Sequence, residues 1–329
     1  MPITTLETAI AAFGQGTPFA KMDRQIAIGV MAFNEEGNIA RLLDSILCQT
    51  AYDDINRVVV IASGCTDRTC PIVERYAAEH PKIHLVTEPE RGGKVRAINT
   101  FFALAPEPIL LVSSADLIFE PQTVAALTAP LADPAVGMVG SHPVPLNSAD
   151  DFIGFTVQLM WQLHHEVSLR NPKMGELIAF RNVFRGLNPD TAADEVQIEH
   201  GVRSVGYEIR YAPDAIVHNR GPETLSDFIA QRTRWIAFNM RIQRVHRLPV
   251  STLTATPLLE AMVAYVRRER PRWDWLVGAA LLEMYCRVRA TIEYSRWNSG
   301  TSGSWTPVAS TKRLVHDADP NHAHAGIHS

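Results

Sequence analysis

The first half of the chain alternates between short apolar runs and longer segments in which apolar residues recur every three or four positions. The run IAIGVMAF at 26–33 is almost continuously apolar, as expected of a strand covered on both faces. After it, Ile39, Leu42 and Ile46 fall on one face of a helix. Further strand-like runs occupy 57–63, 82–87, 109–114 and 136–141, with helical segments at 69–79, 94–104 and 121–131. This repetition predicts an α/β fold, a mainly parallel sheet with helices on both faces.

The second half is less regular and ends in helical segments. We expect a helix at 151–169, a strand at 174–184, two short strands around Pro213 and a helix from 224 to 247. Two more helices are expected at 258–270 and 273–294. The predicted organisation is an N-terminal extension (1–24), a catalytic domain (25–246, with a nucleotide-binding half at about 25–141 and an acceptor half at about 142–246), C-terminal helices (251–295) and a flexible tail (296–329).

Composition narrows the class of protein. Hydrophobic residues make up 46% of the 329 positions and charged residues 20%, which is typical of a globular chain. The net charge of −4 gives no overall attraction to nucleic acid, so we expect no such partner. The four cysteines show neither zinc-like pairing nor a disulfide framework. With no leader-like N-terminus and no apolar run near 20 residues, the sequence predicts a cytoplasmic protein, with contact to the inner face of the membrane left open.

Polar residues follow each of the first four predicted strands. Asn34 and Glu35 come after the first strand and 63–67 after the second, while RGGK at 91–94 and Asp116 follow the third and fourth. In an open α/β sheet the ligand site lies beyond the carboxyl ends of the strands. We therefore expect these residues to meet in one crevice.

Two common phosphate-binding motifs do not match this crevice. A P-loop requires Ser or Thr after its lysine, but Val95 follows Lys94. A dinucleotide fold requires GxGxxG after the first strand, where this chain has FNEEGN. The two glycines before Lys94 still allow a close approach of the backbone to a ligand, with the ammonium as a point charge.

The ordered series AFNEEGNIARLLDSIL, ASGCTDRT, RGGKVRAIN, SSADLIF, ADE and QRTRW resembles the family-two inverting glycosyltransferases of GT-A fold over about 25–246. The resemblance implies transfer of a sugar, with inversion, from a nucleotide-diphosphate donor to a glycan, lipid-linked or small-molecule acceptor, assisted by Mg²⁺ or Mn²⁺. It also implies a donor pocket lined by Ala32, Asn34, Glu35, Ser63, Asp67, Arg91, Gly93, Lys94, Asn99 and Ala115.

The metal-binding motif of this family is incomplete here. Asp116 matches the last acid of the DxD motif, and Ser114 replaces the first. One acid can suffice, because magnesium is held by one or two carboxylates together with substrate phosphates. His218 is a candidate further ligand, although the sequence favours the alternative, a histidine that is packed or hydrogen-bonded at the end of a strand. Ala62 and Ser63 stand where many relatives carry acids, which puts uridine in question as the base of the donor.

The catalytic base predicted by the resemblance lies in TAADE. Counting back from Gly206 and Tyr207 favours Glu195, and a shift of one residue would give the role to Asp194. The alternative is a helix start that carries acids for its dipole. Candidate contacts to the acceptor or diphosphate come from MGELIAFRN and QRTRW, namely Gly175, Arg181, Gln231, Arg232, Arg234 and Trp235.

Three questions remain open from the sequence. The helices at 251–295, with Trp273 and Trp275 beside RRERPR, predict either contact with a membrane surface or a helical lid. A nucleotidyltransferase is a rival function, although the loop after the first strand is acidic rather than glycine-rich and basic. A non-catalytic binding protein is the other rival, because acids are missing at Ser63 and Ser114.

Overall fold

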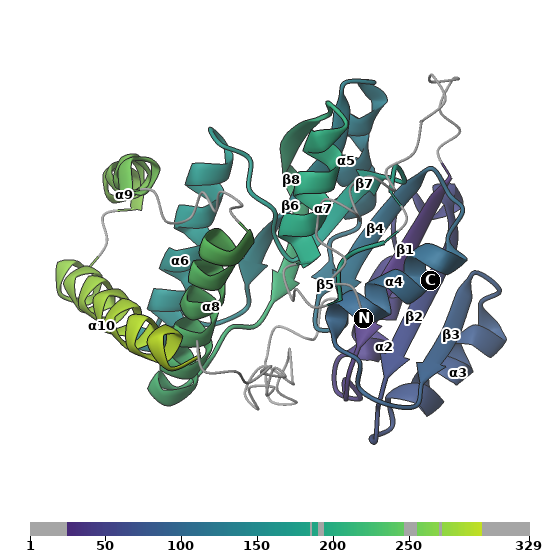
Figure 1. Cartoon of the computed structure of the whole chain (residues 1–329), viewed down its shortest axis with the longest axis horizontal. Coiled ribbons are helices and arrows are strands. Elements are labelled where there is room, and N and C mark those ends of the chain that lie inside the picture. Colours follow the sequence, from purple (N-terminus) through teal and green to yellow (C-terminus); the bar gives the residue numbers. More distant parts are fainter. Residues whose placement is uncertain (1–24, 185, 190–193, 247–254, 270–271, 298–329) are drawn as a thin grey trace.

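A computed structural model describes residues 25–184, 186–189, 194–246, 255–269 and 272–297. Its centre is an eight-stranded sheet in the order β3-β2-β1-β4-β7-β6-β8-β5 (Figure 1). The strands are β1 Ile26–Ala32, β2 Ile55–Ser63, β3 Ile83–Glu88, β4 Ile109–Ser114, β5 Ile118–Phe119, β6 Val136–Pro145, β7 Leu177–Arg181 and β8 Glu208–Asn219. Strand β7 runs antiparallel to both of its neighbours, and β5 runs antiparallel to β8. The other neighbouring strands are parallel, which confirms the predicted sheet.

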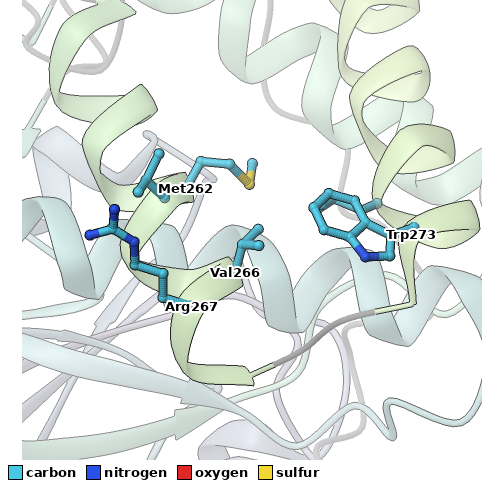
Figure 2. Close-up of a pocket in the computed structure, with 6 residues that line it drawn as sticks. Met262, Val266, Arg267 and Trp273 are labelled. Atoms are coloured by element: carbon cyan, nitrogen blue, oxygen red, sulfur yellow. The ribbon is translucent and has the colours of Figure 1, made fainter.

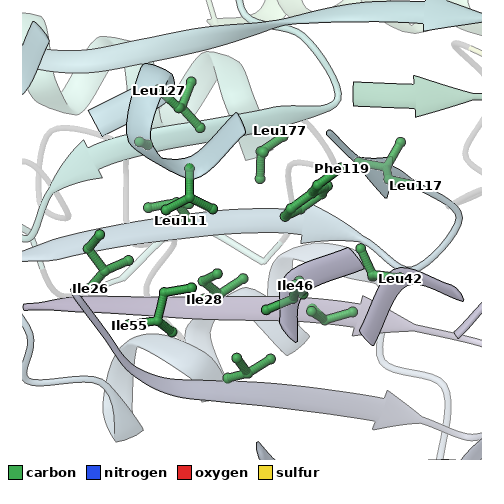
Figure 3. Close-up of a cluster of buried hydrophobic side chains, with 14 of the residues drawn as sticks. Ile26, Ile28, Leu42, Ile46, Ile55, Leu111, Leu117, Phe119, Leu127 and Leu177 are labelled. Atoms are coloured by element: carbon green, nitrogen blue, oxygen red, sulfur yellow. The ribbon is translucent and has the colours of Figure 1, made fainter. Parts of the chain in front are cut away.

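Helices cover both faces of this sheet. One face packs against α2 (Ile39–Leu47), α3 (Thr69–Glu79) and α5 (Thr123–Thr128), and the resulting cluster of buried side chains is drawn in Figure 3. The other face packs against α4 (Lys94–Leu104) and α7 (Asp194–Ser204). Helix α5 is shorter than predicted, because the chain tightens into a 3₁₀ turn over Ala129–Ala132, where Pro130 cannot donate a helical hydrogen bond.

The apolar run of β1 contributes side chains to the buried clusters on both faces of the sheet. Ile26, Ile28 and Val30 belong to the first cluster, whereas Ala27 and Met31 belong to the second. Alternate side chains of a strand point to opposite faces, so a strand buried on both faces must be apolar throughout.

Residues 208–219 form one strand, where the sequence predicted two around Pro213. Gly140 and His142 are two positions apart on β6, but their partners on β8, Tyr211 and Ile216, are five apart. The intervening residues therefore bulge, and Pro213 lies in this bulge, where its missing N–H costs the ladder no hydrogen bond.

The C-terminal helical extension is confirmed. Helices α6 (Phe152–Ser168), α8 (Leu225–His246), α9 (Ala255–Glu269) and α10 (Trp273–Trp297) lie together beside the β6–β8 side of the sheet (Figure 1). Two apolar clusters join them, one through α6, α9 and α10 and the other through α6, α8 and α10. Among the helices that the structure describes, none combines the length and apolar character needed to cross a bilayer.

Candidate active site

The loops after β1 and β2 are held together by side chains that the sequence assigned to the donor pocket. The Asn34 Oδ1 atom accepts a hydrogen bond from the Thr66 backbone N–H at 2.8 Å. Asp67 accepts hydrogen bonds from the backbone N–H groups of Glu36 and Thr69, both at 3.0 Å. Although partial burial opposes it, these hydrogen bonds hold the pKa of Asp67 below its usual value. The two loops thus form one hydrogen-bonded, polar surface at the carboxyl ends of β1 and β2.

The RGGK turn is attached to the same edge. The backbone N–H of Gly92 donates to Ser63 Oγ at 3.1 Å, and the Arg91 guanidinium lies 4.0 Å from the centre of the Phe33 ring. Gly64 has a φ of +65°, and a Cβ there would lie 2.6 Å from the Arg91 backbone nitrogen. Only glycine permits this approach, which brings the turn against the end of β2.

Lys94 connects this edge to the predicted base. It is the first residue of α4, and its Nζ lies 2.8 Å from Asp194 Oδ2 at the start of α7. Burial of the ammonium acts to lower the pKa of Lys94, but the carboxylates of Asp194 and Glu195 outweigh it and raise the pKa above its usual value. Lys94 is therefore a permanent positive charge beside both candidate bases.

Glu195, the other candidate base, is a carboxyl group with a raised pKa. Burial raises its pKa to about 8, and the charge of Asp194 acts in the same direction, against the opposing effect of Lys94. Asp194 is already paired with the ammonium. The geometry therefore favours Glu195 over Asp194 as the group that exchanges a proton.

The structure adds a carboxylate that the sequence interpretation missed. Glu176 directly precedes β7, and burial raises its pKa to about 7 with the charge of Asp116 as the next cause. The signal for it was an acid between a glycine and an apolar strand. Gly175 lets this segment approach β6 closely, since a Cβ there would lie 2.9 Å from Pro143.

The residues around Asp116 fit a hard divalent cation. Asp116 and Glu176 offer carboxylate oxygens, and the buried Oδ1 of Asn219 has no hydrogen-bond partner in the described part of the chain. Such cations prefer oxygen ligands. The described residues contain no group of three His, Cys, Asp or Glu side chains at a metal-binding spacing, so protein carboxylates alone would not enclose the ion.

His218 does not present a free nitrogen to this group. Its Nδ1 lies 3.2 Å from the carbonyl oxygen of Val144, and its Nε2 lies 3.1 Å from Glu120 Oε1. Both ring nitrogens are therefore engaged, which corresponds to the hydrogen-bonded alternative. As a metal ligand, His218 would have to exchange one of these contacts.

Arg181 lies at the far end of the sheet. Because β7 is antiparallel to β4, Arg181 pairs with Ile109 at the start of β4, whereas Asp116 follows its end. Its guanidinium donates to the carbonyl oxygens of Val136 and Leu131, at 2.8 and 2.7 Å. The structure does not bring Arg181 to the site, and its contacts are those of a buried structural residue.

Asn99 forms two hydrogen bonds with the segment that leads to α7. Its Oδ1 accepts from the Leu187 backbone N–H at 2.7 Å, and its Nδ2 donates to the Leu187 carbonyl at 2.8 Å. Its amide is thus used to hold this segment. The remaining small residues of the predicted pocket, Ala32 and Ala115, are buried beside the ends of β1 and β4.

The QRTRW segment lies on α8 and contacts α10. Arg232 pairs with Glu283 of α10 through two contacts of 2.7 and 2.9 Å, and its guanidinium lies 4.7 Å from the centre of the Trp235 ring. Burial and the charge of Arg232 lower the pKa of Lys173 to about 8. Arg232 is therefore close to the segment that leads into Glu176. Gln231 and Arg234 are half-buried on the same helix.

Comparisons with known proteins agree with this fold. The chain is 23% identical to an N-acetylglucosaminyltransferase of Rhizobium leguminosarum bv. viciae over 285 residues, covering 80% of this chain and 64% of that protein. It is 24% identical to the probable glycosyltransferase YdaM of Bacillus subtilis, covering 66% of this chain and 56% of that protein. The chain thus spans about three fifths of the length of these relatives.

A similar fold is found in the mannosyltransferase PcManGT of Pyrobaculum calidifontis, solved with GDP-Man and Mn²⁺. The TM-score is 0.60 at 22% identity, with 90% of this chain and 94% of that one covered. The model of glycosyl transferase family 2 matches residues 27–181, and that of glycosyl transferase family group 2 matches residues 135–287. The chain belongs to the family-2 glycosyltransferases of GT-A fold.

Proposed function

We propose that this chain is a metal-assisted, inverting glycosyltransferase that moves a sugar from a nucleotide-diphosphate donor to an acceptor hydroxyl. The proposal is carried by one observation. Side chains from separate strand ends meet at one edge of the sheet, with Lys94, Asp194, Glu195, Glu176 and Asp116 close enough to influence one another's charge. Within the described residues of this group, one cation faces four acids, which is an arrangement suited to a charged ligand and to proton transfer.

Glu195 is the proposed base. Its carboxylate takes the proton of the acceptor hydroxyl as that oxygen attacks the anomeric carbon on the face opposite the leaving diphosphate. Asp194 orients this machinery through its ion pair with Lys94. The ammonium of Lys94 also attracts the anionic donor and places its charge next to the base.

Asp116 and Glu176 are the residues placed to hold Mg²⁺ or Mn²⁺. A divalent cation bound there supplies positive charge that stabilises the leaving diphosphate. The presence of GDP-Man and Mn²⁺ in the similar mannosyltransferase supports a role for a divalent cation.

A screen of sugar donors tests the proposed reaction. We expect UDP-, GDP- or dTDP-sugars incubated with Mn²⁺ to release free nucleoside diphosphate for at least one base. Release of pyrophosphate from a sugar phosphate and nucleoside triphosphate would instead identify a nucleotidyltransferase. Donor binding without turnover for every base and with a range of sugar acceptors would identify a non-catalytic binding protein.

The helical layer gives a reason to expect the acceptor at a lipid surface. The outward side of α10 carries an apolar stripe, each member 49–64% exposed, made of Trp273, Val277, Leu281, Met284, Tyr285, Val288 and Ile292. At one end it adjoins an apolar hollow of about 330 Å³ between α9 and α10, drawn in Figure 2. Arg267 lines this hollow and has no ion-pair partner among the described residues. An apolar stripe beside an indole and a guanidinium fits an anionic lipid surface.

Vesicle sedimentation tests this contact. The chain should pellet with vesicles of phosphatidylcholine and phosphatidylglycerol, and Leu281→Glu combined with Val288→Glu should abolish pelleting because the charges would enter the lipid. Val205→Glu, at an exposed apolar position outside the stripe, is the matched control. If the wild-type chain stays in the supernatant and the double variant instead converts a dimer into a monomer, the stripe is a surface for a second copy.

A further inference from the structure

The antiparallel pairing of β4 and β7 places an acid beside the position where the DxD motif lacks one. Ser113 of β4 pairs with Leu177 of β7, so the next pair at this edge is Ser114 and Glu176. Directly opposite residues of an antiparallel pair project to the same face, with Cβ atoms about 5 Å apart. Glu176 therefore starts from the strand next to the missing acid and reaches the same face of the sheet.

Strand β8 flanks the loop of Asp116 on the side opposite β7. Ile118 pairs with His218, so the next antiparallel position places Leu117 opposite Asn219, directly after Asp116. The Asn219 Nδ2 atom donates to Glu176 Oε1 at 3.3 Å. The loop that carries Asp116 is thus bracketed by Glu176 on β7 and by Asn219 on β8.

The side-chain oxygen of Asn219 is a buried hydrogen-bond acceptor without a partner in the part of the chain that the structure describes. The residue is 7% exposed, and its buried Oδ1 has no hydrogen-bond partner within the described residues. A buried polar atom of this kind in a native structure calls for a partner such as an ion or a water molecule. The Nδ2 contact holds this amide next to the carboxylate of Glu176.

The charges around Glu176 favour a bound cation. Lys94 acts on Glu176 as well, but its direct ion pair is with Asp194, at 2.8 Å. Asp116 is the main charge that acts on Glu176. The carboxylates of Asp116 and Glu176 repel each other, and a divalent cation bound between them would relieve this repulsion.

We propose that Glu176 and Asn219 complete the divalent-cation site of Asp116, with Glu176 replacing across the sheet the acid that is missing at Ser114. The proposal rests on the function proposed above. It explains how the chain retains a two-carboxylate site, which is the number that Mg²⁺ commonly takes from protein when substrate phosphates supply further oxygens.

Mn²⁺ binding to the full chain tests this site without measuring activity. The electron paramagnetic resonance signal of free Mn²⁺ is recorded as protein is added in the presence of GDP or UDP. Glu176→Gln should weaken Mn²⁺ binding about tenfold or more, the scale of losing a supporting group at a metal site. Asp214→Asn, which removes an exposed acid from the bulge of β8, should leave the affinity within about threefold, because surface substitutions away from the site have small effects.

Moving the acid back across the strand pair distinguishes a ligand from a merely structural residue. Ser114→Asp combined with Glu176→Gln should restore most of the lost affinity, because the carboxylate returns to the adjacent position. Circular dichroism and the melting temperature check that each variant is folded. Unchanged Mn²⁺ affinity in Glu176→Gln, or no recovery in the double variant, would overturn the proposal. No Mn²⁺ uptake by the wild-type chain would also overturn it, whereas donor turnover in EDTA would leave sugar transfer itself intact.

Discussion

Glu195→Gln is expected to slow sugar transfer by about 10²–10⁴-fold while donor affinity stays within about threefold, the usual outcome of removing a positioned base. Glutamine keeps the shape of the side chain but cannot accept the proton of the acceptor hydroxyl. Donor affinity should persist because the carboxylate is proposed to contact the acceptor side of the reaction. Single-turnover transfer and donor titration by calorimetry measure the two quantities separately.

The assignment of Glu195 as the base also predicts how kcat/KM depends on pH. A base works in its deprotonated form, and burial raises the pKa of Glu195 to about 8. The value of kcat/KM should therefore rise as pH increases through about 8 and fall below it, and Glu195→Gln should remove this rise. A profile that is flat between about pH 7 and 9, values that lie roughly one unit on either side of this pKa, would contradict the assignment.

Asp194→Asn separates the two candidate bases. It breaks the ion pair with Lys94 but leaves the carboxylate of Glu195 in place. We expect a smaller loss of kcat than in Glu195→Gln, accompanied by weaker donor binding as Lys94 loses its fixed position. If Asp194→Asn instead shows the large loss of kcat at unchanged donor affinity, the base is Asp194.

Asp116→Asn is expected to abolish the stimulation of donor binding by Mn²⁺, so that the donor Kd with the metal becomes about equal to the Kd in EDTA. A carboxylate contributes both charge and a lone pair to a hard cation, and a neutral amide is a weaker ligand. Calorimetric titration of a nucleoside diphosphate with and without Mn²⁺ measures this ratio.

Asp214→Asn is the control for that experiment, because it removes an exposed acid from the bulge of β8 and leaves the sheet edge intact. It should retain the metal dependence of the wild-type chain. If Asp116→Asn also retains it, Asp116 does not belong to the metal site.

The strand–helix alternation and the edge of the sheet that carries the site could be predicted from the sequence. The apolar run of β1 and the helical spacing of α2 are local patterns, and each strand end is followed directly by its polar residues. In a parallel sheet these ends meet at one edge whatever the details of packing. The convergence of Asn34, Lys94 and Asp116 therefore required no knowledge of register.

The roles of Arg181 and Glu176 were decided by tertiary structure alone. Both flank the same short strand, and the antiparallel direction of β7 sends Arg181 to the far end of the sheet and Glu176 to the site. Nothing local in MGELIAFRN encodes that direction, because it depends on which strands β7 pairs with. Register also sets Glu176 against Ser114, so a carboxylate from a distant part of the chain can take the place of one that the motif has lost.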